Sequence, residues 1–293
     1  MLELTRLTAP IVALAYSADG SRLVCVDQRG RLTTFVGMRE ERSLNIPGSP
    51  RSLTLDAAQP LAIVGCREGT VHWLDLEAGR LVQSVAMPLP IAVSGLALIS
   101  SNLLVVGQGE RFNLEMGRLT ILEAVKAKPE RHRLDVPTGV WSLAGVPGQR
   151  RVLYTAGATS LYSWDINQPD PQRVGNQPGG VGLCVSPDGQ LAATATPEYA
   201  IHICGLASAR HRRTLQGHSS RVMALTFSMN GRTLLSGAWG EGELRAWDID
   251  SARVHCLQPA IGRIQAVACS PDGLVNVAGS DRGIVVVWDN DEY

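Results

Sequence analysis

The feature that most constrains this chain is an internal repeat that runs through its 293 residues. Short segments such as "GTVHWLD", "GELRAWD" and "GIVVVWD" recur at intervals of about 40 residues and can be written in register. The sixth residue of each segment is Phe35, Leu74, Leu122, Trp164, Cys204, Trp247 or Trp288. Seven units of similar length predict seven copies of one small structural element.

Each unit has the pattern of several short β-strands. Alternating apolar residues run into a turn, as in "VALAYSADG" and "VGLCVSPDG". The Ser-Pro-Asp-Gly sequence suits a tight turn, because Pro presets φ and Gly accepts a positive φ. A second apolar run such as "RLVCV" follows, and the registered segment supplies a third. Three clear strands and a weaker fourth are therefore expected per unit. Since helical periodicity over ten residues is not evident, radial β repetition is favoured.

On these residues the chain resembles the WD-repeat β-propeller family. The Trp-Asp pairs at 164–165, 247–248 and 288–289 carry the resemblance, together with Gly217-His218. The resemblance implies an all-β fold, one seven-bladed β-propeller over residues 1–293 with four-stranded antiparallel blades. The expected sequence repeats are 9–48, 49–88, 89–137, 138–176, 177–218, 219–260, and 261–293 plus 1–8.

The last unit stops one strand early, directly after its Trp-Asp pair. In the family the sequence repeat is offset from the blade, so the resemblance implies that the N-terminal strand completes the last blade. We expect Leu2–Thr8 to pair beside Gly283–Asp289. This closure would cover strand edges that otherwise promote aggregation.

Strongly matching repeats of the family contain a buried hydrogen-bonded tetrad of His, Ser or Thr, Asp and Trp. The sixth unit nearly has this set, with His218, Ser236 and Trp247, and with Glu241 where Asp is expected. An unsatisfied buried polar group costs about 1–3 kcal/mol, so the set works together or is lost together. Apolar residues replace the tryptophan in four other units, and most blades are expected to rely on apolar packing. We expect these positions to be structural.

The resemblance places binding residues on the top face, which is built from loops between blades and from turns between second and third strands. The residue early in each inner strand is expected to face the channel mouth; this ring is Val12, Arg51, Ser94, Trp141, Val181, Met223 and Gln265. The turns add Arg29, Arg67, Tyr199 and Trp239, and an extended loop adds Arg111, Phe112 and Asn113.

Trp, Arg and Met are enriched in interface cores, so we expect a protein or peptide partner on this face. The candidate contact residues are Arg51, Trp141, Met223, Gln265, Arg111, Phe112, Trp239 and Tyr199. For Trp141 and Trp239, packing against a neighbouring blade remains an open alternative. The expected role is that of a non-catalytic scaffold, a subunit of a multi-protein assembly.

An enzyme with a site at the channel mouth is the first alternative function. Metal-using propellers need acids, Asn or His converging on the channel, and the expected ring contains none. His72 and His202 fall at equivalent third-strand positions of different units, so a shared metal site is not expected. The sequence contains no G-x-S-x-G, H-E-x-x-H or Walker A motif. We therefore expect no catalysis, no metal and no cofactor.

A nucleic-acid-binding subunit is the second alternative. Two basic stretches, Lys126–Arg133 and Ala209–Arg213, are expected on the rim of the ring. Neither has interleaved aromatic residues that could stack on bases. The 27 basic residues equal the 27 acidic ones, so no overall charge directs the chain to nucleic acid. Nucleic acid is therefore not the expected partner.

The compartment is expected to be the cytoplasm. Six scattered cysteines without a C-x-x-C pair are typical of buried thiols in a reducing compartment. No apolar stretch approaches the length of a membrane span, and the run "APIVALAY" is interpreted as a strand. The strong preference for Arg over Lys is typical of a GC-rich, bacterial coding sequence.

Overall fold

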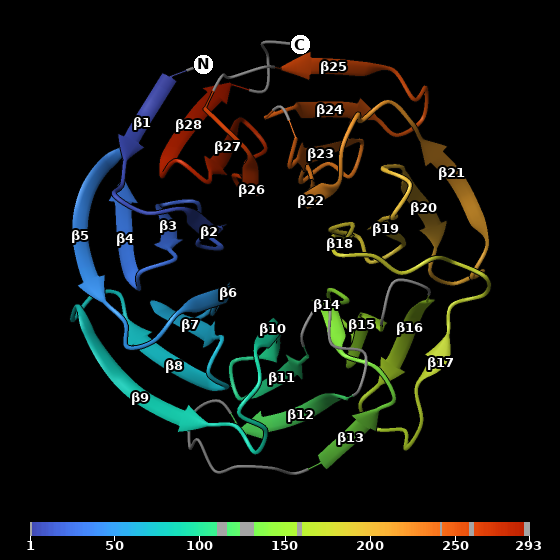
Figure 1. Cartoon of the computed structure of the whole chain (residues 1–293), viewed down its shortest axis with the longest axis horizontal. Coiled ribbons are helices and arrows are strands. Elements are labelled where there is room, and N and C mark those ends of the chain that lie inside the picture. The colour runs from blue at the N-terminus through green and yellow to red at the C-terminus, as the bar shows by residue number, and fades with distance from the viewer. Residues whose placement is uncertain are drawn as a thin grey trace.

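The computed structural model describes residues 2–109, 116–123, 132–156, 160–240, 242–257 and 261–289. Within these residues the chain forms seven four-stranded sheets. The sheets are antiparallel and stand like blades around a common centre, as Figure 1 shows. The predicted seven-bladed all-β propeller is thereby confirmed.

Each blade places its strands in the same order from the centre outward. The innermost strands are β2 (Ile11–Tyr16), β6 (Pro50–Leu55), β10 (Val93–Ser100), β14 (Val140–Gly145), β18 (Leu183–Val185), β22 (Val222–Phe227) and β26 (Ile264–Cys269). The second strands are β3 (Arg22–Asp27), β7 (Leu61–Cys66), β11 (Leu103–Gln108), β15 (Arg151–Ala156), β19 (Leu191–Ala195), β23 (Thr233–Ala238) and β27 (Val275–Ser280).

The third strands are β4 (Arg31–Val36), β8 (Thr70–Asp75), β12 (Gly117–Glu123), β16 (Ser160–Asp165), β20 (Ile201–Gly205), β24 (Leu244–Asp248) and β28 (Ile284–Asp289). The outer strands are β5 (Arg39–Asn45), β9 (Arg80–Ala86), β13 (His132–Val136), β17 (Gln172–Arg173), β21 (His211–Leu215), β25 (Val254–Leu257) and β1 (Leu2–Arg6). We number the blades from the one that begins with β2. The face on which the innermost strands begin is called the top, and the opposite face the bottom.

The seventh blade is completed by the N-terminal strand, as predicted. Strand β1 pairs antiparallel with β28, with Leu2 opposite Val287 and Arg6 opposite Ile284. The pairing continues at Leu7, whose backbone N–H donates to the carbonyl of Gly283 at 2.8 Å. The two ends of the described chain thus lie in one sheet, and the ring is closed (Figure 1).

The core lies between neighbouring blades rather than in a single centre. The second strands are buried along nearly their whole length, because both of their faces are covered. One such cluster joins Val105 and Leu119 of the third blade to Trp164 of the fourth. No helix in the described part of the chain has the length and apolar character needed to cross a membrane.

A glycine in the second strand lets adjacent blades approach closely. A Cβ atom added at Gly237 would lie 2.2 Å from Ile264 Cγ2 of the next blade. At Gly279, a Cβ would lie 2.6 Å from Ile11 Cγ2, across the blade junction near the closure. Gly65 and Gly107 have the same close contact with Val93 and Val140, so in four blades the first residue of the next inner strand occupies the space that a side chain would need.

Candidate functional site

A pocket of about 500 Å³ opens on the top face above the sixth, seventh, first and second blades. We call it the top pocket. Its walls are Pro10, Val12, Gln28, Pro50, Arg51, Arg67, Arg221, Met223, Trp239, Arg263, Gln265 and Asp281. These residues come from the starts of inner strands and from turns between second and third strands, so separate parts of the sequence meet here.

The top pocket brings together four of the predicted contact residues. Arg51, Met223 and Gln265 enter from the inner strands β6, β22 and β26, and Trp239 enters from the turn after β23. The first three side chains are half-buried, while Trp239 keeps 43% of its surface exposed. The structure therefore assembles an arginine, a methionine, an amide and an aromatic ring around one opening.

The other predicted contact residues do not line the top pocket. Trp141 is half-buried on β14 of the fourth blade, and Tyr199 is exposed in the turn after β19 of the fifth. Arg111 and Phe112 lie outside the described residues. Four of the eight predicted contact residues therefore line one pocket, and the other four do not.

Three charged residues of the top pocket were missed from the sequence. Arg221 directly precedes β22, Arg263 directly precedes β26, and Asp281 follows β27. The repeated position of the two arginines, one residue before an inner strand, is the signal that could have found them. The predicted ring contained only residues expected within the inner strands, and the predicted turn residues did not include Asp281.

Arg263, Trp239 and Asp281 contact one another at the edge of the top pocket. The Arg263 guanidinium carbon lies 4.9 Å from the centroid of the Trp239 ring, a cation–π arrangement. The Arg263 Nε atom lies 3.8 Å from Asp281 Oδ2, and the backbone N–H of Arg263 donates to Asp281 Oδ1 at 2.9 Å. These contacts hold the exposed indole and one guanidinium in place.

The sixth blade contains a buried hydrogen-bonded network next to the top pocket. Trp247 Nε1–H donates to Ser236 Oγ at 2.8 Å, and Ser236 Oγ lies 2.6 Å from His218 Nε2. His218 Nδ1 lies 3.1 Å from Glu243 Oε2, and Ser219 Oγ–H donates to Glu243 Oε1 at 3.2 Å. A neutral His218 that donates from Nδ1 and accepts at Nε2 satisfies the whole set.

The acid of this network is Glu243, where the sequence predicted Glu241. Glu241 itself lies outside the described residues. Because β24 begins at Leu244, the residue directly before this strand reaches back to the loop that carries His218. The turn contains two glutamates, and the acid that contacts His218 is the one nearer to Trp247 in the sequence.

Burial, hydrogen bonds and nearby charge determine the protonation states of His218 and Glu243. Burial lowers the pKa of His218 to about 4, although the hydrogen bond to Glu243 opposes the shift. Burial alone would raise the pKa of Glu243, but the hydrogen bond from His218 and the charge of Arg245 bring it below its ordinary value. Near pH 7, His218 is therefore neutral and Glu243 is ionised.

The same loop and turn carry residues of the top pocket. The backbone N–H of Trp239 donates to the Arg221 carbonyl at 2.9 Å, and that of Gly240 donates to Ser220 Oγ at 2.7 Å. With the His218–Glu243 contact, these bonds join the loop before β22 to the turn after β23. The network thus positions Arg221 and Trp239 relative to each other.

Charge is unevenly distributed over the top face. The described top-face loops and turns of the third, fourth and fifth blades carry a single charged side chain, Glu198. The other side of the ring carries four arginines in the top pocket and Arg29 and Arg282 in neighbouring turns, against four described acids, Asp27, Glu68, Asp281 and the buried Glu243. The chain has no net charge, so this local excess is a property of the surface and not of the composition.

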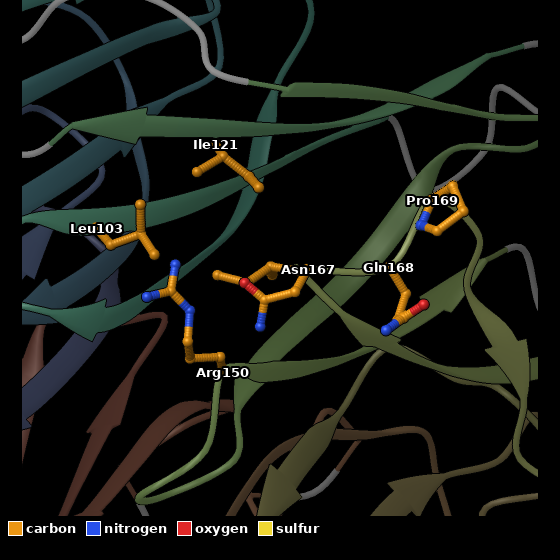
Figure 2. Close-up of a pocket in the computed structure, with 7 residues that line it drawn as sticks. Leu103, Ile121, Arg150, Asn167, Gln168 and Pro169 are labelled. Atoms are coloured by element: carbon orange, nitrogen blue, oxygen red, sulfur yellow. The ribbon is translucent and has the colours of Figure 1, made fainter.

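A second pocket of about 390 Å³ lies on the bottom face between the third and fourth blades. It is lined by Leu103, Ile121, Arg150, Ile166, Asn167, Gln168 and Pro169. Figure 2 shows Leu103 and Ile121 on one side and Arg150 and Asn167 on the other. Its walls are apolar and amide groups with one charge, and none of the predicted contact residues belongs to it.

Metal-ligating side chains do not converge in the described part of the chain. No group of three His, Cys, Asp or Glu residues there could hold a metal ion. His72 is buried in the second blade, where its ring nitrogens lie 2.7 Å from Ser84 Oγ and 3.2 Å from Thr70 Oγ1. His202 belongs to the fifth blade, on β20. The two histidines are therefore separate.

The two basic stretches fall on outer strands or outside the described residues. Residues 126–131 are not described, and the second stretch leads into β21. Arg212 on β21 is exposed, and its Nη2 lies 3.9 Å from Asp250 Oδ1. Neither stretch lines the top pocket.

Comparison with known proteins adds a family match for one sequence repeat, which spans the outer strand of the fifth blade and the first three strands of the sixth. The model of the WD domain, G-beta repeat, matches residues 209–248, which include β21 to β24 and the His218 network. The matched segment is thus the unit with the most complete polar set. At the position of Ser236 the other units have Cys25, Val64, Val106, Tyr154, Thr194 and Ala278.

Several curated proteins are similar to parts of this chain. Small ribosomal subunit protein RACK1y of Oryza sativa subsp. japonica is 31% identical over 77 residues, which are 25% of this chain and 23% of that protein. An uncharacterized WD repeat-containing protein of Synechocystis sp. is 28% identical over 99 residues, 33% of this chain and 28% of that protein. COMPASS component SWD3 of Saccharomyces cerevisiae is 36% identical over 66 residues, 22% of this chain and 20% of that protein. The matches span less than a third of each relative.

Proposed function

Because the chain belongs to the WD-repeat β-propeller family, we propose that it is a non-catalytic scaffold that binds a protein or peptide partner on its top face. WD-repeat propellers generally serve as protein-interaction scaffolds. Two of the similar proteins are named as parts of larger assemblies, a small ribosomal subunit protein and a COMPASS component. The corresponding role here is that of a subunit in a multi-protein complex.

One observation carries this proposal: the top pocket combines Arg51, Met223, Trp239 and Gln265 from three inner strands and one turn. Arginine, methionine and tryptophan are enriched in the cores of interfaces, and tryptophan and arginine dominate binding hot spots. An exposed indole that is held by neighbouring contacts loses little conformational freedom on binding. A closed ring presents these groups already in position.

The experiment is affinity purification of the tagged chain from its native organism. The test variant combines Met223→Ala, Trp239→Ala and Gln265→Ala in the top pocket. The matched control combines Arg150→Ala and Gln168→Ala, two exposed residues of the bottom pocket. Circular dichroism melting checks that both variants remain folded.

We expect the same protein partner to co-purify with the wild type and the control, and to be lost from the top-pocket variant. Retention of the partner by a folded top-pocket variant would place the interface elsewhere. Loss of the partner from the control alone would assign binding to the bottom face.

A further inference from the structure

The top pocket has a strong excess of positive charge. Its four arginines, Arg51, Arg67, Arg221 and Arg263, face one acid, Asp281, which leaves an excess of three positive charges. Asp281 is engaged by Arg263 through both its backbone N–H and its guanidinium. Among the described residues, neither Arg67 nor Arg221 forms an ion pair with an acidic side chain, although the charge of Arg67 helps to lower the pKa of the neighbouring Glu68.

The four arginines come from three blades and converge because the ring is closed. Arg51 and Arg67 belong to the second blade, Arg221 to the sixth and Arg263 to the seventh. Closely placed like charges repel each other, and low-dielectric walls increase that repulsion. A ligand that brings negative charge into this pocket relieves the repulsion, so the free pocket is arranged to favour an anion.

The remaining walls favour a peptide as the source of that negative charge. Pro10, Val12, Pro50 and Met223 form apolar surface beside the arginines, and the Trp239 ring stands at the edge. A pocket of about 500 Å³ holds a few side chains rather than a folded domain. Guanidinium groups bind carboxylates through paired N–H···O bonds, and an apolar residue next to the acid would cover the apolar wall.

Nucleic acid matches these walls less well. Single strands are bound by a positive groove that follows the backbone, with aromatic rings on which successive bases stack. Here the charge is concentrated in one pocket, and the Trp239 ring is already in contact with the Arg263 guanidinium. The described top-face turns of the third to fifth blades do not continue the positive surface.

We propose that the top pocket recognises an acidic peptide segment of the partner. Asp or Glu side chains contact Arg51, Arg67 and Arg221, and a neighbouring apolar side chain packs against Met223 and Trp239. This inference rests on the proposed scaffold function and specifies the chemistry of what is bound.

The test is fluorescence anisotropy of the purified full chain against an array of labelled peptides. Each peptide carries two or three Glu or Asp residues beside one apolar residue, which is varied through Leu, Met, Phe, Tyr and Trp. Matched peptides replace every acid by Gln or Asn. A labelled oligothymidylate serves as the nucleic-acid probe.

We expect members of the acidic array to bind, and their amide counterparts to bind at least about tenfold more weakly, because each charge-assisted pair is lost. Binding of the acidic peptides should weaken as salt is added. The charge-reversal variant Arg67→Glu/Arg221→Glu should lose the acidic peptides and bind analogues in which Lys replaces the acids. The control Arg150→Glu/Arg173→Glu, which reverses two exposed arginines away from the pocket, should bind as the wild type does.

Equal binding of acidic and amide peptides, or no binding anywhere in the acidic array, would overturn the inference. So would a charge-reversal variant that retains acidic peptides, or oligothymidylate that displaces them with higher affinity. The scaffold function is tested separately, because the neutral variant at Met223, Trp239 and Gln265 can lose its partner even if acidic peptides fail to bind.

Discussion

The fourth and sixth blades bury a tryptophan at the same place and satisfy it differently. Trp164 lies opposite Val152 on β15, and Trp247 lies opposite Leu234 on β23. Both side chains are almost fully buried. Trp164 Nε1–H donates to the carbonyl of Gln168 in the adjacent turn at 3.0 Å, a contact within its own blade.

The second strands of these two blades, β15 and β23, also differ beside the tryptophan. At the position of Ser236 in the sixth blade, the fourth blade has Tyr154, whose ring stacks on Tyr162 with centroids 5.2 Å apart. The fourth blade thus has aromatic side chains where the sixth blade has a hydrogen-bonded series of polar side chains that ends at Glu243. The buried tryptophan thus contributes to the packing of both blades. The polar network is specific to the sixth blade, where it joins two top-face segments and positions Arg221 and Trp239.

The largest expected effect is common to both blades. Trp164→Ala and Trp247→Ala should each lower the free energy of unfolding by about 3–5 kcal/mol, because a large buried side chain leaves a cavity. Trp247→Ala should cost more, since its acceptor Ser236 is fully buried, whereas the Gln168 carbonyl that accepts from Trp164 belongs to an exposed residue. Urea unfolding followed by circular dichroism measures both, and a loss below about 1 kcal/mol for Trp164→Ala would contradict the shared structural role.

The next effect belongs to the sixth blade alone. His218→Ala should lower the free energy of unfolding by about 1–3 kcal/mol, because buried Ser236 and Glu243 each lose a partner. The matched control in the fourth blade is Gln168→Ala, an exposed side chain whose loss should change stability by no more than about 0.5 kcal/mol. Similar losses for both variants would remove the distinction between the two blades.

Acid should weaken the sixth blade through His218. Its pKa is about 4 in the folded chain and about 6.5 when unfolded, so the unfolded chain binds more protons between these pH values. Stability from this residue is complete above about pH 6.5 and falls as pH drops toward 4. Between pH 7 and 5 the wild type should lose about 1–2 kcal/mol more than His218→Gln, which cannot titrate. Parallel pH profiles of the two proteins in urea unfolding would contradict this.

The smallest effect on stability distinguishes the top-face tryptophans. Trp239→Ala should cost about 0.5–1 kcal/mol, chiefly the contact with Arg263, and should abolish partner binding. Trp141→Ala should cost more stability, because that side chain is half-buried, and should leave partner binding unchanged. Thermal melting and co-purification of both variants measure the two effects. A partner that depends on Trp141 rather than Trp239 would reverse the assignment.

The fold was predictable from the sequence because each unit repeats the same strand and turn signals at nearly constant spacing. The closure by Leu2–Arg6 was also predictable, since the last unit stops one strand early. The site was predictable only in part. Arg221 and Arg263 precede strands on different blades and meet only because the ring brings both to one opening. Glu243 was missed because the turn contains two glutamates, and the repeat pattern alone selected Glu241 instead.

The most direct test of the proposed interface is hydrogen exchange of the chain alone and in complex with its captured partner, read by mass spectrometry. Binding at the top pocket should protect backbone amides around residues 28–29, 67–69, 221–223, 239–240 and 263–265, and leave residues 149–151 and 166–169 unchanged. Protection at the bottom pocket of Figure 2, or only over the top turns of the third to fifth blades, would contradict it.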